Sequence, residues 1–151
     1  MKNYFKEAKE LKDELIKNRR HIHEKPELGL ELPQTKEYVM KYLKEIGASI
    51  KEVGKSGVQA TIKGEKGQGK RVLIRADMDA LPMQEESGLD FSSKNKFVAH
   101  TCGHDLHTSI GLSTAKLISK HKKDFKGEVR FMFQPAEEIF EGSKMMIENG
   151  V

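Results

Sequence analysis

The sequence contains a single cysteine and no tryptophan among its 151 residues. One cysteine excludes an internal disulfide framework of the kind that stabilises small secreted proteins. A reducing cytoplasm fits this cysteine usage, so we predict a cytoplasmic protein. The lone thiol, Cys102, is then a candidate for chemistry rather than for covalent cross-linking.

Long apolar runs are also missing. No stretch approaches the roughly 18 apolar residues that a membrane span needs, and the segment from Met1 to Arg20 lacks the apolar core of a secretory signal. Aromatic residues make up only 7%, and the basic residues behind the net charge of +4 alternate with acidic ones. Nucleic-acid recognition needs a basic stripe with stacking aromatics, so we expect neither a nucleic-acid nor a membrane partner.

The remaining composition, 36% hydrophobic and 33% charged, is typical of one globular domain. Apolar residues at helical spacing predict helices over residues 5–23, 33–47, 105–120 and 142–149. Alternating apolar residues predict strands over residues 50–53, 58–62 and 129–133. The uninterrupted apolar run at 72–74 predicts a buried strand. This order predicts an α/β fold, with a mixed sheet flanked by helices.

Three polar clusters follow predicted strands or precede a predicted helix: residues 75–79, 100–107 and 134–138. Irregular sequence joins the first two clusters, and so long a loop in a compact domain is usually functional or disordered. In open α/β sheets, ligands bind at the carboxyl ends of the strands. We therefore expect the acidic residues of the first and third clusters to converge at that edge.

The second cluster surrounds the only cysteine with histidines. In an extended segment His100, Cys102 and His104 would share one face, because side chains alternate along extended backbone. His104 and His107, three apart at a helix start, would also be neighbours. Thiolate, imidazole and carboxylate together are the ligands of zinc and similar metals, which favours a metal site. The alternative for any one of these histidines is a hydrogen-bonded structural role.

The third cluster ends in two adjacent glutamates, Glu137 and Glu138. Adjacent carboxylates usually lie on a solvated surface, but these directly follow an apolar strand. If one binds metal, its neighbour points elsewhere and can act as base on metal-activated water, which favours hydrolysis over a structural zinc site. In the first cluster, Asp77 or Asp79 can hold the far nitrogen of a ligating imidazole, or alternatively cap a helix or turn.

Four blocks occur in order along the sequence: RRHIH at 19–23 with PELG at 26–29, RADMDALP at 75–82, HTCGHDLH at 100–107 and QPAEE at 134–138. Together these blocks resemble the M20 metallopeptidase family. Specifically, they resemble its amidohydrolase branch, which includes hippurate hydrolases, N-acetyldiaminopimelate deacetylases and auxin-conjugate hydrolases. The resemblance runs from about Arg19 to the end of the chain.

The resemblance implies a role for each matching residue. Cys102, His104 and Glu138 would be metal ligands. Glu137 would be the general base that activates water and then protonates the leaving amine, and Asp79 the aspartate that orients the metal site. The cofactor would be a divalent metal, zinc, manganese, cobalt or nickel, with two ions in each complete site.

Members of this family are much longer than the present chain. They carry an inserted lid and dimerisation domain, and a C-terminal return to the catalytic sheet, and those later parts hold two further ligand histidines. The resemblance therefore implies that residues 1–151 are the N-terminal part of the catalytic domain, with the lid and C-terminal part absent. It leaves a homodimer open for the full-length form.

The resulting hypothesis is metal-dependent hydrolysis of the amide bond of a small N-acylated amino acid or peptide, with a glutamate as general base. The alternative is a truncated, catalytically inactive metal-binding fragment, which the missing ligands would favour. A thiol-based redox function for Cys102 is disfavoured, because no second cysteine exists to resolve an oxidised thiol.

Overall fold

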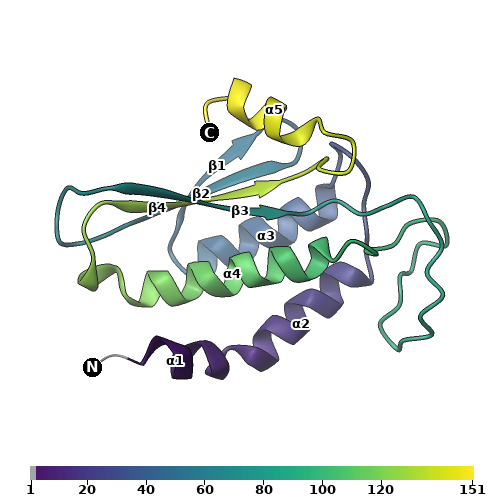
Figure 1. The fold of residues 1–151 in the computed structure, drawn as a ribbon, viewed down its shortest axis with the longest axis horizontal. Coiled ribbons are helices and arrows are strands. Elements are labelled where there is room, and N and C mark those ends of the chain that lie inside the picture. Colours follow the sequence, from purple (N-terminus) through teal and green to yellow (C-terminus); the bar gives the residue numbers. More distant parts are fainter. Residues whose placement is uncertain (1–2) are drawn as a thin grey trace.

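A computed structural model of the chain describes residues 3–151 and shows a mixed four-stranded sheet (Figure 1). Strand β1 (Ser49–Val53) pairs antiparallel with β2 (Gly57–Lys63), and β2 pairs antiparallel with β4 (Glu128–Gln134). The last strand, β3 (Arg71–Asp77), runs parallel to β4. The carboxyl ends of β3 and β4 therefore lie side by side, at the edge where ligands are expected in such sheets.

Helices cover both faces of the sheet, so the predicted fold class is confirmed. One face is covered by α3 (Pro33–Glu45) and α4 (His104–Lys120), while α5 (Gly142–Glu148) lies on the opposite face (Figure 1). Helix α2 (Lys12–His23) packs on α4, outside this layer. The remaining helical elements are α1 (Tyr4–Glu10) and a short 3-10 turn, η1 (Lys122–Asp124).

The alternation of side chains along β4 divides the core between the two faces. Phe131 and Phe133 are buried on the face that packs against α3 and α4. Met132, between them, points to the other face and is buried with Val53 and with Met146 of α5. This period of two agrees with the alternating strand that the sequence predicts at 129–133.

The first predicted helix is wrong in its continuity, because the chain forms α1 and α2 with a break at Leu11. The Leu11 N–H donates to the Ala8 carbonyl, 3.2 Å away, so the helical turn tightens there. Leu11 is buried, whereas no residue of α1 is. Helical periodicity continues through such a break and therefore cannot reveal it.

The predicted burial of the apolar run at 72–74 is also wrong. Val72 and Leu73 are 51% and 50% exposed. Within residues 3–151, β3 is an edge strand that pairs only with β4. Three consecutive apolar residues predict a strand correctly, but they do not distinguish an edge strand from a central one.

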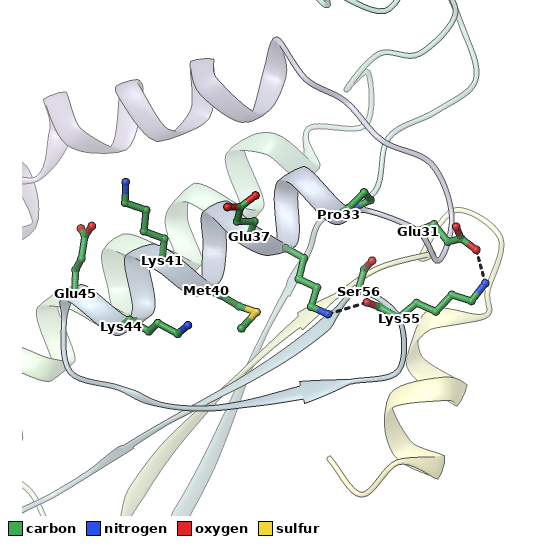
Figure 2. Close-up of a pocket in the computed structure, with 10 residues that line it drawn as sticks. Glu31, Pro33, Glu37, Met40, Lys41, Lys44, Glu45, Lys55 and Ser56 are labelled. Carbon is green, nitrogen blue, oxygen red and sulfur yellow. Dashed lines mark hydrogen bonds and ion pairs between the residues drawn. The ribbon is translucent and has the colours of Figure 1, made fainter.

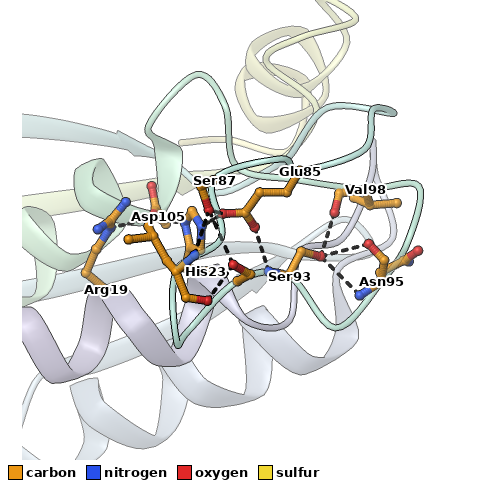
Figure 3. A network of polar contacts seen from close by, with 10 residues as sticks. Arg19, His23, Glu85, Ser87, Ser93, Asn95, Val98 and Asp105 are labelled. Carbon is orange, nitrogen blue, oxygen red and sulfur yellow. Dashed lines mark hydrogen bonds and ion pairs between the residues drawn. The ribbon is translucent and has the colours of Figure 1, made fainter.

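The segment between β3 and α4 is described in full and contains no helix or strand, only isolated β-bridges. Side-chain contacts connect this segment to α2 (Figure 3). The imidazole of His23 lies between two carboxylates, with Nδ1 2.7 Å from Asp105 Oδ2 and Nε2 3.0 Å from Glu85 Oε1. Arg19 Nε donates to the same Asp105 oxygen over 2.7 Å. The backbone N–H of Ser93 donates to Glu85 Oε2 over 2.6 Å.

Glu85 therefore makes an acid-sensitive contribution to stability. Its burial would raise its pKa, but hydrogen bonds from His23, Ser87 and the Ser93 backbone lower the pKa to about 2. We expect Glu85→Gln to lower the free energy of unfolding at neutral pH by about 2–3 kcal/mol. Because the folded-state pKa is depressed, this contribution is fully present above about pH 4.5 and is lost as the pH falls through about 2.

Urea unfolding of both proteins between pH 7 and pH 2 measures this difference directly. Glu86→Gln, an exposed neighbour, is the matched control and is expected to change little. A difference between Glu85→Gln and the unsubstituted protein that stays constant down to pH 2 would contradict the electrostatic explanation.

Candidate metal centre

Three residues from the second and third polar clusters lie together at the carboxyl edge of the sheet. Cys102 precedes α4, His104 is the first residue of α4, and Glu138 follows β4. One ligand atom from each lies within 4.8 Å of the other two. Within residues 3–151, this is the one group of three or more His, Cys, Asp or Glu side chains placed closely enough to hold a metal ion. The convergence expected for the acidic residues of the first and third clusters is seen in a separate contact, in which the Asp79 carboxylate accepts the backbone N–H of Glu138.

Gly103 determines how the chain enters this site. It adopts φ +85, in the left-handed region that glycine occupies without strain, and the helix starts at the next residue. The extended alternation expected for His100, Cys102 and His104 is therefore wrong. Cys102 is exposed, whereas His100 is 5% exposed and its ring lies 6.3 Å from that of His23. Burial lowers the pKa of His100 to about 4, so this imidazole is neutral at physiological pH.

Asp79 connects the histidine and the glutamate. The Nδ1 atom of His104 lies 2.9 Å from the Asp79 carbonyl oxygen and 3.3 Å from Oδ1. The other carboxylate oxygen of Asp79 accepts the backbone N–H of Glu138 over 3.0 Å. These contacts leave His104 Nε2 facing the two glutamates, 3.7 Å from Glu137 Oε2 and 3.8 Å from Glu138 Oε1.

The charges of His104 and Asp79 stabilise each other. Hydrogen bonding to Asp79 raises the pKa of His104 to about 9, against the opposing effect of burial. Burial would raise the pKa of Asp79, but the hydrogen bonds from His104 and from the Glu138 and Glu137 backbone lower it overall. A hydrogen bond with Glu138, together with burial and nearby acidic charge, raises the pKa of the Cys102 thiol. Metal binding here would therefore be accompanied by proton release.

A strained turn after β4 presents the two glutamates. Ala136 is buried and adopts φ 54, and its carbonyl accepts the backbone N–H groups of Glu141 and Gly142. A Cβ on Gly142 would lie 1.6 Å from the Pro135 carbonyl oxygen, so only glycine fits there. Strain of this kind is often found at functional sites. Sequence reasoning missed this turn, for which Gly142 was the available signal.

A second carboxylate–imidazole pair lies beside the first. His107 Nδ1 is 3.0 Å from Asp77 Oδ2, and Asp77 Oδ1 accepts a hydrogen bond from Arg75 Nη2 over 2.6 Å. His107 is not part of the three-ligand group, and its side chain is 43% exposed. The pairing of the two aspartates with the two histidines was not specified by the sequence, which left both aspartates as candidates for one role.

The residues present fit a divalent metal. Sulfur, imidazole nitrogen and carboxylate oxygen are the donor set of zinc and related ions. The Oε1 atom of Glu138 is buried and has no hydrogen-bond partner among the described residues. A buried carboxylate oxygen without a donor is costly, and a cation would satisfy it.

A separate pocket of the structure lacks this combination of thiol, imidazole and carboxylate side chains. It runs along α3 and contains none of the predicted site residues (Figure 2). Its lining alternates acidic and basic groups, and Figure 2 shows Glu31 and Lys55 turned toward each other as an ion pair. This is the charge pattern of a solvated surface.

Among residues 3–151, none of the helices combines the length and apolar character of a membrane span.

Comparison with known proteins links this geometry to a family. The model of peptidase family M20/M25/M40 matches residues 73–151. The N-acyl-L-amino acid amidohydrolase of Geobacillus stearothermophilus is 44% identical over 94% of this chain and 39% of its own length. The hippurate hydrolase of Campylobacter jejuni is 44% identical over 99% of this chain and 38% of its own length.

A solved structure gives the same result. The YXEP protein of Bacillus subtilis, described as a dinuclear metal binding peptidase from the M20 family, superimposes with a TM-score of 0.90 at 43% identity. The match covers 94% of this chain and 40% of that one. The chain thus spans less than half the length of each of these relatives.

Proposed function

The chain belongs to peptidase family M20/M25/M40, and from this premise we propose that it provides the metal centre of an enzyme that hydrolyses the amide bond of N-acyl amino acids or small peptides. The observation that carries the proposal is the meeting of Cys102, His104 and Glu138 within 4.8 Å, with Glu137 directly beside them. The names of the Geobacillus and Campylobacter relatives support the substrate class.

In this proposal each residue of the site has one task. Cys102, His104 and Glu138 hold a divalent metal, which when bound polarises the amide carbonyl and acidifies water. Glu137 accepts the proton of the attacking water as the C–O bond forms. It then delivers that proton to the amide nitrogen as the C–N bond breaks, which releases the carboxylic acid and the free amine. Asp79 holds His104 in the orientation that directs Nε2 toward Glu137 and Glu138, where it would be available to a metal.

The proposal has three finer parts, which concern the metal ions, the place of the chain in its domain and the compartment. Two ions, of zinc, manganese, cobalt or nickel, occupy the complete site, as the dinuclear description of the YXEP protein supports. Residues 1–151 act as the N-terminal part of the catalytic domain in this scheme, and the protein works in the cytoplasm.

Cobalt titration tests the centre, because thiolate-bound cobalt has a charge-transfer absorption that needs no activity to be seen. We expect the purified chain to bind Co²⁺ with this absorption, and Cys102→Ser to abolish it and to weaken binding at least about tenfold. Thr101→Ser, next to it in the sequence, is the matched control. An unchanged spectrum in Cys102→Ser would show that Cys102 does not bind the metal and would contradict the proposed centre.

Hydrolysis of N-acetyl-L-leucine by the metal-loaded protein then distinguishes a hydrolase from a catalytically inactive metal-binding fragment. Release of leucine that requires the metal supports the hydrolase. Tight, stoichiometric metal binding without hydrolysis favours the metal-binding fragment instead.

A further inference from the structure

Two residues of the first sequence block, Arg19 and His23, have no task in the proposed metal centre, yet they contact a residue next to it. Both lie on α2, and both reach Asp105 Oδ2: His23 through Nδ1 at 2.7 Å, and Arg19 through Nε at 2.7 Å. Asp105 is fully buried and directly follows His104 in the first turn of α4. Helix α2 is therefore connected to the turn that begins with a proposed metal ligand.

A single glycine separates the two proposed ligands at positions 102 and 104. Gly103 adopts φ +85, and a Cβ built on it would meet no atom within 4 Å other than those of its chain neighbours. Packing on that side of Gly103 therefore does not hold its backbone, which a glycine leaves freer to rotate than other residues do. The separation of the Cys102 thiol and the His104 imidazole consequently depends on what holds the chain on each side of Gly103.

The chain before this glycine is held together as one unit. Leu81 and Ala99 exchange two backbone hydrogen bonds of 3.0 Å, which fold the segment that follows β3 back on itself. Glu85 lies within this fold, and its side chain lines the same cavity as Ala99 and His100. A contact made to Glu85 therefore acts on the segment that leads to Cys102.

His23 bridges the two sides of the glycine. Its Nδ1 lies 2.7 Å from Asp105 Oδ2, after Gly103, and its Nε2 lies 3.0 Å from Glu85 Oε1, before it. Figure 3 shows the ring between these two carboxylates. Phe91 packs edge-on against the ring, with centroids 5.5 Å apart, which restricts its rotation. The side chains of His23, Glu85 and Asp105 are 6%, 8% and 0% exposed, so water screens these contacts little.

We infer that His23 is a positioning residue of the metal centre, which holds Cys102 and His104 at the separation that a shared ion requires. It acts through Asp105 on one side of the glycine and through Glu85 on the other. The inference rests on the proposed function, because that proposal supplies the metal. A rigid ring with a nitrogen on either side can donate to two carboxylates at once, which a single amide group in its place cannot do.

Two substitutions each keep one half of this bridge. His23→Asn places an amide nitrogen close to the position of Nδ1, and so keeps the contact with Asp105 alone. His23→Gln places one close to the position of Nε2, and so keeps the contact with Glu85 alone. We expect both variants to bind Co²⁺ about tenfold more weakly than the unsubstituted chain, and to shift the thiolate charge-transfer absorption of the complex.

Amide hydrogen exchange in the metal-free chain measures the same effect without the ion. The backbone N–H groups of Leu106 and His107 both donate to the Gly103 carbonyl, over 3.1 and 3.0 Å, so their exchange reports local opening at this glycine. We expect this exchange to be about tenfold faster in both His23 variants. All measurements are made under conditions in which urea unfolding shows each variant to be folded.

His21→Asn is the matched control, because His21 lies on the same helix but stacks on Tyr38, with ring centroids 4.1 Å apart. It should leave the cobalt affinity, the absorption and the exchange within about twofold. Reduced stability of the His23 variants with unchanged cobalt binding by the folded chain would assign His23 a structural role and overturn the inference.

The remaining outcomes separate the inference from the proposed function. Faster exchange in both variants with unchanged cobalt binding would overturn the positioning role and leave the metal centre intact. Full recovery of cobalt binding in His23→Asn would show that the Asp105 contact suffices without a bridge, and would also overturn the inference. Absence of the thiolate absorption in the unsubstituted chain would refute the proposed centre itself, and with it the inference. Weaker cobalt binding together with faster exchange in both variants would uphold it.

Discussion

Exchanging Glu137 for glutamine is expected to lower kcat for hydrolysis of an N-acyl amino acid by about 10²–10⁴-fold, with the metal content unchanged. The reason is that glutamine keeps the shape of the side chain but cannot accept the proton of the attacking water. Glu137 Oε2 lies 3.7 Å from His104 Nε2, and its side chain is 32% exposed, so that it borders the predicted ligands and is open to water. The measurement is steady-state hydrolysis with elemental analysis, in a preparation whose unsubstituted form turns over the same substrate.

Glu141→Gln is the matched control, since this exposed glutamate lies four residues further along the same turn and helix start. It should leave kcat within about twofold. If Glu137→Gln lost its metal together with its activity, Glu137 would be a ligand, and the division of roles between the two glutamates would be reversed. If it kept full activity, the proposed mechanism would be wrong.

The fold was predictable where side-chain periodicity decides the structure. Phe131 and Phe133 alternate with Arg130 and Met132, which point to the opposite face of the sheet, and both phenylalanines are buried under α3 and α4. The hydrophobic effect makes such a pattern informative, because shifting it by one residue would expose the entire apolar set. The edge position of Val72 and Leu73 was not predictable in this way. It depends on which strands pair, and pairing is a property of the whole sheet.

The site was predictable in its chemistry and less so in its geometry. A thiol, imidazoles and carboxylates at strand ends were enough to single out Cys102, His104 and Glu138, which the fold brings within 4.8 Å. Local backbone conformation decided the rest. The left-handed Gly103 joins Cys102 to the first turn of α4, and the strained Ala136 begins the turn that carries the two glutamates. Such conformations depend on tertiary contacts that no short sequence pattern encodes.

Asp79 gives the second large effect, because one buried carboxylate supports two parts of the centre. Its side chain is 1% exposed, lies against His104 Nδ1 and accepts the Glu138 N–H. We expect Asp79→Ala to weaken cobalt binding by about 100-fold and to destabilise the fold by about 1–3 kcal/mol for each buried group left without a partner. Asp79→Asn, which keeps the volume and one acceptor oxygen, should weaken cobalt binding less, by about tenfold.

The comparison between these two variants distinguishes orientation from simple packing. If Asp79 only filled space or capped a turn, asparagine would restore cobalt affinity completely, and loss of stability would account for the alanine variant. If the carboxylate orients His104 and adds negative charge near the metal, asparagine must remain weaker than aspartate even when urea unfolding shows equal stability. Asp13→Asn, an exposed aspartate on α2, removes one negative charge far from the centre and should leave the affinity within about twofold. A deficit in Asp13→Asn as large as that in Asp79→Asn would mean that the net charge of the chain, rather than the contact with His104, sets the affinity.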